Sequence, residues 1–178
     1  MYILTVIDHI SDLCAWVAKA MLLALIGAMI WEVSARYLFN SPTLWAFDIS
    51  YMLNGTIFLL GAGFTLKADA HVRIDFLSCA LPIKIQQWIN AFFYLCVLLP
   101  IFGAFAYTSS KKTFIAFTSS EVERVSPWAP LVWPFYLAIA IGLWVFALQF
   151  FTDGVRYLQQ QKVPGDHNGE MVTDEELI

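Results

Sequence analysis

Three long stretches of the chain are apolar and contain no Asp, Glu, Lys or Arg. They run from Ile49 to Leu66, from Ile85 to Ser110 and from Val125 to Thr152, and contain 18, 26 and 28 residues. About 20 consecutive apolar residues in an α-helix cross the hydrocarbon core of a bilayer. Each stretch therefore predicts one membrane-spanning helix.

A fourth apolar segment, residues 13–38, precedes these stretches and carries three charges, Lys19, Glu32 and Arg36. Pro42 follows it and favours a turn, because proline cannot continue a helix. Together the four segments predict an all-α integral membrane protein with four transmembrane helices. We place the spans at about residues 13–38, 44–66, 87–110 and 128–152.

Two details refine this prediction. The stretch before the third span, residues 83–90, mixes polar and apolar residues. It is either an amphipathic helix in the membrane interface or the first turns of the third span. Pro100 predicts a kink within that span. In the second span, Gly55 and the run Gly61-Ala62-Gly63 predict close approach of another helix.

The composition agrees with a membrane protein. Hydrophobic residues make up 60% of the chain and charged residues only 13%, whereas soluble domains carry about 25% charged residues. Five acidic residues and no Lys or Arg lie in the last 13 positions, and they account for more than the net charge of −4. We therefore divide the chain into a membrane domain, residues 1–160, and an acidic tail, residues 161–178, which we expect to be disordered.

The charges at the span ends allow two interpretations each. Glu32 and Arg36 are four residues apart, which places them on one helix face where they can pair. The pair either orients the helix end or contacts a partner protein. Asp48 lies where the second span begins, as a carboxylate favoured by the helix dipole. It could also reach Arg36 across the turn at Pro42.

The sequence gives no sign of catalysis. His71 and Asp75 offer only two metal ligands, and Arg73 between them would repel a cation. None of the three histidines lies in an apolar span, which argues against haem ligation inside the bilayer. No phosphate-binding loop or hydrolase motif is present. We expect no catalytic, cofactor-binding or metal site, and therefore no enzyme.

Four short motifs occur in order along the chain. They are an acidic residue with Arg-Tyr at the end of the first span, a Pro-x-x-Trp-x-x-acidic stretch, His-Val-x-x-Asp after the second span, and Leu-Pro soon after. The residues that form them are Glu32, Arg36, Tyr37, Pro42, Trp45, Asp48, His71, Val72, Asp75, Leu81 and Pro82. Over about residues 10–150, this order and spacing resembles the DctQ family, the small membrane subunit of tripartite ATP-independent periplasmic (TRAP) transporters. Asp48 departs from the pattern, since the family more often has Glu there.

The resemblance implies a scaffold for a large multispan subunit. In such systems the large subunit carries the substrate and sodium sites, and a periplasmic solute-binding protein delivers a carboxylate or sugar acid. The implied partners are those two proteins and the lipid bilayer, with no nucleic acid. The implied interface or structural residues are Glu32, Arg36, Tyr37, Pro42, Trp45, Asp48, His71, Arg73 and Asp75.

The implied location is the bacterial inner membrane. An even number of spans puts both termini on one side, and a cytoplasmic N-terminus places five basic residues inside against four outside. We therefore predict cytoplasmic N- and C-termini. Two alternatives remain open: an autonomous small carrier that uses Glu32, and a membrane anchor subunit of an enzyme complex.

Overall fold

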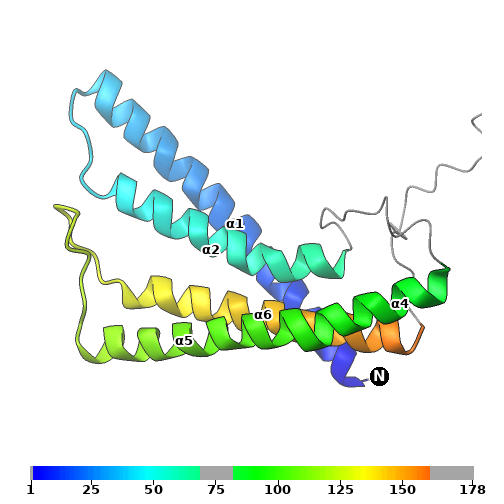
Figure 1. Cartoon of the computed structure of the whole chain (residues 1–178). Coiled ribbons are helices and arrows are strands. Elements are labelled where there is room, and N and C mark those ends of the chain that lie inside the picture. Colours follow the sequence, from blue (N-terminus) through cyan, green and yellow to red (C-terminus); the bar gives the residue numbers. More distant parts are fainter. Residues whose placement is uncertain (1, 69–81, 161–178) are drawn as a thin grey trace, which may run out of the picture.

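The computed structural model describes residues 2–68 and 82–160, and these residues are almost entirely helical (Figure 1). His71, Arg73 and Asp75 and the acidic tail lie outside the described residues. Four helices are long and apolar enough to cross a membrane, which confirms the predicted class. The elements are α1 (Tyr2–Leu38), α2 (Ala46–Lys67), α4 (Ile83–Phe92), the π-helix η1 (Phe93–Leu98), α5 (Leu99–Thr118) and α6 (Trp133–Leu158).

The third long helix is built from three elements in direct succession. α4 continues into η1 and then into α5 without a break, so residues 83–90 form the first turns of this helix. Pro100 lies in the first turn of α5 and has no N–H to bond to the carbonyl of Cys96, four residues earlier in η1. The π-helical segment ends two residues before Pro100, and the kink predicted at Pro100 stays a prediction.

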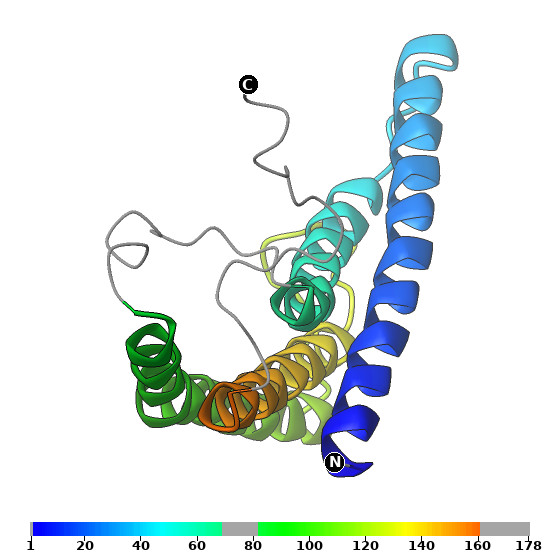
Figure 2. The ribbon, with the colours of Figure 1, turned by 90° about the vertical axis from the view of Figure 1, so that its right-hand side faces the viewer.

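Helix α6 occupies the middle of the bundle. It packs against α2 on one side and against α4, η1 and α5 on the other, while α1 lies beside α2 on the flank and crosses α6 near its own N-terminus (Figure 2). Half of the residues in the most apolar 18-residue segment of α6 are buried within the chain, against 11–22% of the residues in the corresponding segments of the other three spans. The outer helices therefore present most of their apolar surface to lipid or to another protein.

Small residues set the distance between α2 and α6. A Cβ added at Gly142 would lie 2.9 Å from the backbone carbonyl carbon of Leu59, which leaves no room for a side chain. Gly55 lies against the ring of Phe135, and Gly63 lies against Val145. The close approach predicted from the glycines of the second span is confirmed at Gly55 and Gly63 but not at Gly61, where a Cβ would meet nothing within 4 Å, and the tightest contact is made by Gly142 of α6.

Candidate functional site

Polar and charged side chains gather in two zones about 30 Å apart along the bundle. From Asp12 to Glu32, α1 rises through 20 residues at about 1.5 Å each, which matches the thickness of a bilayer's hydrocarbon core. Lys19 of α1 lies between the zones, with its ammonium 5.2 Å from the centre of the Trp16 ring, and Lys111 and Lys112 lie within α5, with their ammonium groups over the rings of Tyr107 and Tyr136. The distance between the two zones along α1 is therefore about the thickness of the hydrocarbon core.

The first zone contains the Glu32 cluster, made of Glu32, Arg36 and Thr43. Arg36 donates from Nε and Nη2 to Oε1 of Glu32, at 3.1 and 2.5 Å. The other oxygen, Oε2, accepts the backbone N–H of Thr43 at 2.9 Å and also its hydroxyl. Asn40 adopts a left-handed conformation (φ 48°) where the chain leaves α1, and this turn brings Thr43 back to Glu32. The predicted local pair is confirmed, and it also fixes the turn to α2.

The same zone contains the Asp48 cluster, made of Asp48, Tyr51, Glu123 and Ser126. Asp48 lies in the first turn of α2, as predicted, and its Oδ2 accepts the hydroxyl of Ser126 in the α5–α6 loop. Tyr51 donates to Oε2 of Glu123 at 3.1 Å. The alternative contact of Asp48 with Arg36 does not form, because Arg36 is bound to Glu32 and Asp48 reaches the other loop.

The remaining residues of the family pattern surround these clusters. Tyr37 is 79% exposed at the end of α1, where it is free to meet lipid headgroups or a partner. Pro42 is exposed in the turn, and Trp45 lies half-buried directly before α2. The structure thus brings together Glu32 and Arg36 on one face of α1, Glu32 and Thr43 through the turn, and Asp48 and a distant loop.

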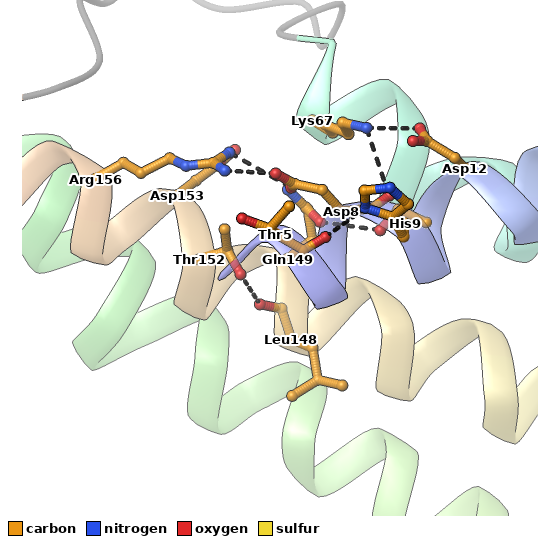
Figure 3. A network of polar contacts seen from close by, with 11 residues as sticks. Thr5, Asp8, His9, Asp12, Lys67, Leu148, Gln149, Thr152, Asp153 and Arg156 are labelled. Carbon is orange, nitrogen blue, oxygen red and sulfur yellow. Dashed lines mark hydrogen bonds and ion pairs between the residues drawn. The ribbon is translucent and has the colours of Figure 1, made fainter. Parts of the chain in front are cut away.

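The second zone contains a larger network, the Asp8 cluster (Figure 3). Arg156 of α6 forms an ion pair with Asp8 of α1. Gln149 donates to Oδ1 of Asp8 at 3.2 Å and accepts the hydroxyl of Ser11 at 2.9 Å. Both Ser11 and Gln149 are fully buried, so these bonds form the inner side of the contact between α1 and α6.

Two further ion pairs complete this cluster. Lys67, in the last turn of α2, lies 2.6 Å from Oδ1 of Asp12 and also donates to the backbone carbonyl of Asp8 at 3.4 Å. Arg156 lies 3.7 Å from Oδ1 of the buried Asp153. Figure 3 shows Lys67 and Arg156 approaching the first turns of α1 from two different helices. The Asp8 cluster therefore joins α1, α2 and α6 at one end.

Sequence reasoning did not identify the Asp8 cluster as a unit. Asp8 and Asp12 precede the predicted first span, and Lys67 and Arg156 counted only as cytoplasmic charges. A usable signal was present: four alternating spans place the start of α1 on the same side as the ends of α2 and α6. Acidic residues at that start and basic residues at those ends are then expected to pair.

The chemistry of both zones is that of ion pairs and hydrogen bonds between helices. Among the described residues, no group of three or more metal-ligating side chains comes together. The carboxylates of Glu32 and Asp8 both bond to an arginine that faces them. The Asp8 contact joins α1 to α6, whereas the Glu32 contacts lie within α1 and the turn that follows it.

Residues 25–160 match the DctQ family, the DctQ component of tripartite ATP-independent periplasmic transporters. The chain belongs to this family. The matched residues include both zones except for the start of α1. Asp8 and Asp12 therefore lie before the matched region, and their partners lie within it: Lys67, Gln149 and Arg156. In this DctQ-family chain, the Asp8 cluster thus fastens the first turns of α1 to the matched part.

Two curated relatives are transport proteins. The chain is 31% identical over 94 residues to the sialic acid TRAP transporter permease protein SiaT of Haemophilus influenzae, covering 53% of this chain and 15% of that protein. It is 27% identical over 96 residues to the sialic acid TRAP transporter small permease protein SiaQ of Vibrio cholerae, covering 54% of each chain. The matched segments thus span about half or less of these relatives.

Proposed function

We propose that this chain is the small membrane subunit of a TRAP transporter and scaffolds a large multispan subunit. The transporter would take up a carboxylate or sugar-acid solute in a sodium-driven, binding-protein-dependent way. Membership of the DctQ family carries this proposal. Both relatives are named for sialic acid, a sugar acid, which supports the solute class. The match covers only 15% of the Haemophilus permease, so in that protein a segment of this kind is part of a much longer chain.

The arrangement of the helices supports a scaffold. α1 and α5 expose large apolar side chains along their length, including Trp16, Trp31 and Phe105. Hydrogen bonds from Gln149 to Asp8 and from Ser126 to Asp48 tie elements together at the two ends, and α6 is packed tightly between its neighbours. A rigid body of this kind can hold the fixed part of a partner while another part of that partner moves.

The two alternatives find less support. An autonomous carrier would need Glu32 to release and bind a proton or cation, but both of its oxygens already accept hydrogen bonds from Arg36 and Thr43. An enzyme anchor would be expected to hold a cofactor or a catalytic group. The metal-ligand groupings needed for that are not found among the described residues.

Reconstitution tests the proposal. This chain, the large subunit and the binding protein would be purified and combined in liposomes with an inward sodium gradient, and uptake of labelled sialic acid would be measured. We expect uptake only with all three proteins, and co-purification of this chain with the large subunit in detergent. Sodium-driven uptake by this chain alone would reject the scaffold and favour the autonomous carrier.

Both termini would face the cytoplasm of the bacterial inner membrane. This orientation rests on the even number of spans and on the small excess of basic residues on that side. It would place the Asp8 cluster at the inner surface and the Asp48 cluster at the outer surface. When fused after Gln160, a reporter that works only in the cytoplasm should be active, and one that works only in the periplasm should be inactive. The opposite result would reverse the assignment.

A further inference from the structure

A pocket of about 420 Å³ opens between the start of α2 and the α5–α6 loop. Two carboxylates, Asp48 and Glu123, line it together with Tyr51 and Ser126. The lining residues within the described parts of the chain include no lysine, arginine or histidine. The pocket is therefore acidic and has no basic group of its own.

One carboxylate oxygen in this pocket lacks a donor. Asp48 is 1% exposed, and its Oδ2 accepts the hydroxyl of Ser126. Its Oδ1 is buried and has no hydrogen-bond partner among the described residues. Glu123 differs, because its Oε1 accepts two backbone N–H groups and its Oε2 accepts Tyr51. A buried carboxylate oxygen is costly unless a donor reaches it, so Asp48 keeps an uncompensated negative charge in the wall of the pocket.

The surroundings favour an organic cation. A divalent metal needs more oxygen ligands than the two carboxylates supply, and no larger grouping exists in the described chain. A guanidinium or ammonium group brings several N–H donors and can also lie against an aromatic ring such as that of Tyr51. Phe47 and Val125 on the lining are 78% and 91% exposed. Exposed apolar groups around a buried charge are typical of a protein interface that excludes water from a central contact.

We propose that this pocket receives the guanidinium or ammonium group of a basic side chain of the large membrane subunit. The proposal rests on the scaffold function and names one point of attachment. Asp48 would form the charged contact, with Glu123 adding to the negative potential. The apolar residues around them would close over the pair and strengthen the attraction by removing water.

The decisive variant is Asp48→Asn, which removes the charge but keeps the size and the acceptor for Ser126. Two measurements have opposite expected signs. The midpoint of thermal unfolding of the isolated chain in detergent should stay the same or rise, because a buried carboxylate without a counter-charge is removed. Retention of the large subunit on the immobilised chain should fall about tenfold or more, because a basic group would be left unpaired in the interface. Asp48→Glu keeps the charge and should retain the partner.

Glu121→Gln is the matched control, since Glu121 is an acidic residue of the same loop that does not line the pocket. It should leave both measurements unchanged. If the Asp48→Asn chain unfolds at a lower temperature when isolated, Asp48 serves the fold and the proposal is wrong. If the wild type retains the large subunit and Asp48→Asn retains it equally, the attachment point is wrong but the scaffold stands. If the wild type retains no large subunit, the proposed function itself fails.

The amine of a lipid headgroup is the other source of an ammonium group for this pocket. The isolated wild type and Asp48→Asn would be compared in nanodiscs of phosphatidylethanolamine and of phosphatidylglycerol. A side chain of the partner as the occupant predicts the same difference between the two variants in both lipids. A thermal stabilisation of the wild type that needs phosphatidylethanolamine and disappears in Asp48→Asn would assign the pocket to lipid and overturn the proposal.

Discussion

At one end of the bundle, Glu32 bonds to Arg36 on its own helix and to Thr43 in the turn that follows. At the other end, Asp8 bonds to Gln149 and Arg156, which lie on a helix more than 140 residues away in sequence. The first contact shapes a local reversal of the chain. The second joins three helices that are far apart in sequence, and it adds to the apolar packing between them.

Burial adds to this difference. The side chain of Arg36 is 55% exposed, whereas that of Arg156 is 26% exposed and faces both Asp8 and the fully buried Asp153. Exposed pairs stabilise proteins little, while breaking a buried pair leaves a charge without compensation. The Asp8 cluster, which sequence reasoning did not identify, is therefore more important for stability than the Glu32 pair of the family pattern.

The largest expected effect comes from Arg156→Gln. It removes the counter-charge that Asp8 and Asp153 share and should lower the free energy of unfolding by about 3 kcal/mol. This is the low end of the range for buried pairs, since Arg156 keeps part of its side chain exposed. Unfolding in mixed micelles, followed by circular dichroism, measures it. Arg124→Gln, in the exposed α5–α6 loop, is the control.

A double-mutant cycle then isolates the pair from other effects. Asp8→Asn combined with Arg156→Gln should cost less than the sum of the two single changes, because the double variant leaves fewer charges unpaired. Additive losses, or an Arg156→Gln variant as stable as Arg124→Gln, would show that the Asp8 cluster does not hold the helices together.

Between the two ends, close backbone packing holds α2 against α6. Gly142→Leu places a side chain where even a Cβ would lie 2.9 Å from Leu59, and it should cost about 1–3 kcal/mol through overpacking. Gly27→Ala is the matched control, because a Cβ there meets nothing within 4 Å. The control should be neutral or stabilising by up to about 1 kcal/mol, since alanine favours helix more than glycine. Equal losses in both variants would contradict close packing at Gly142 as the cause, because a side chain at Gly27 meets no neighbour.

Sequence reasoning succeeded where the partners are close together along the chain. The apolar runs predicted four spans, and the spacing of Glu32 and Arg36 predicted their pair, because helical periodicity determines both. Contacts between helices were harder to predict. Asp48 meets Ser126 and Asp8 meets Arg156 because of how the spans pack, and no local period encodes that choice.

The glycines also show that contacts between helices are hard to predict from the sequence. Gly55 and the run from Gly61 to Gly63 were recognisable as a group of small residues in one span, whereas Gly142 lies 12 residues from Gly154, the other glycine of α6. Only the position of Leu59 across the interface identifies Gly142 as essential for close packing. The predicted roles of the family-pattern residues at a subunit interface stay predictions.

The smallest expected effect is that of the Glu32 pair. Arg36→Ala should cost no more than about 1 kcal/mol in the isolated chain, because Arg36 is half exposed and Thr43 still bonds to Glu32. It should nevertheless reduce co-purification with the large subunit, or uptake, more than Lys19→Ala does. Exchanging the charges, with Glu32→Arg and Arg36→Glu together, tests whether the pair acts locally.

The exchange should recover only part of the loss. An arginine at position 32 can pair with a glutamate at position 36, but it offers no acceptor for the backbone N–H and hydroxyl of Thr43. Full recovery would show that the ion pair alone is required and that the turn contact is dispensable. If Arg36→Ala changes neither unfolding nor co-purification nor uptake, the pair contributes nothing measurable. Glu32 would then act through Thr43, as the residue that fixes the turn from α1 to α2.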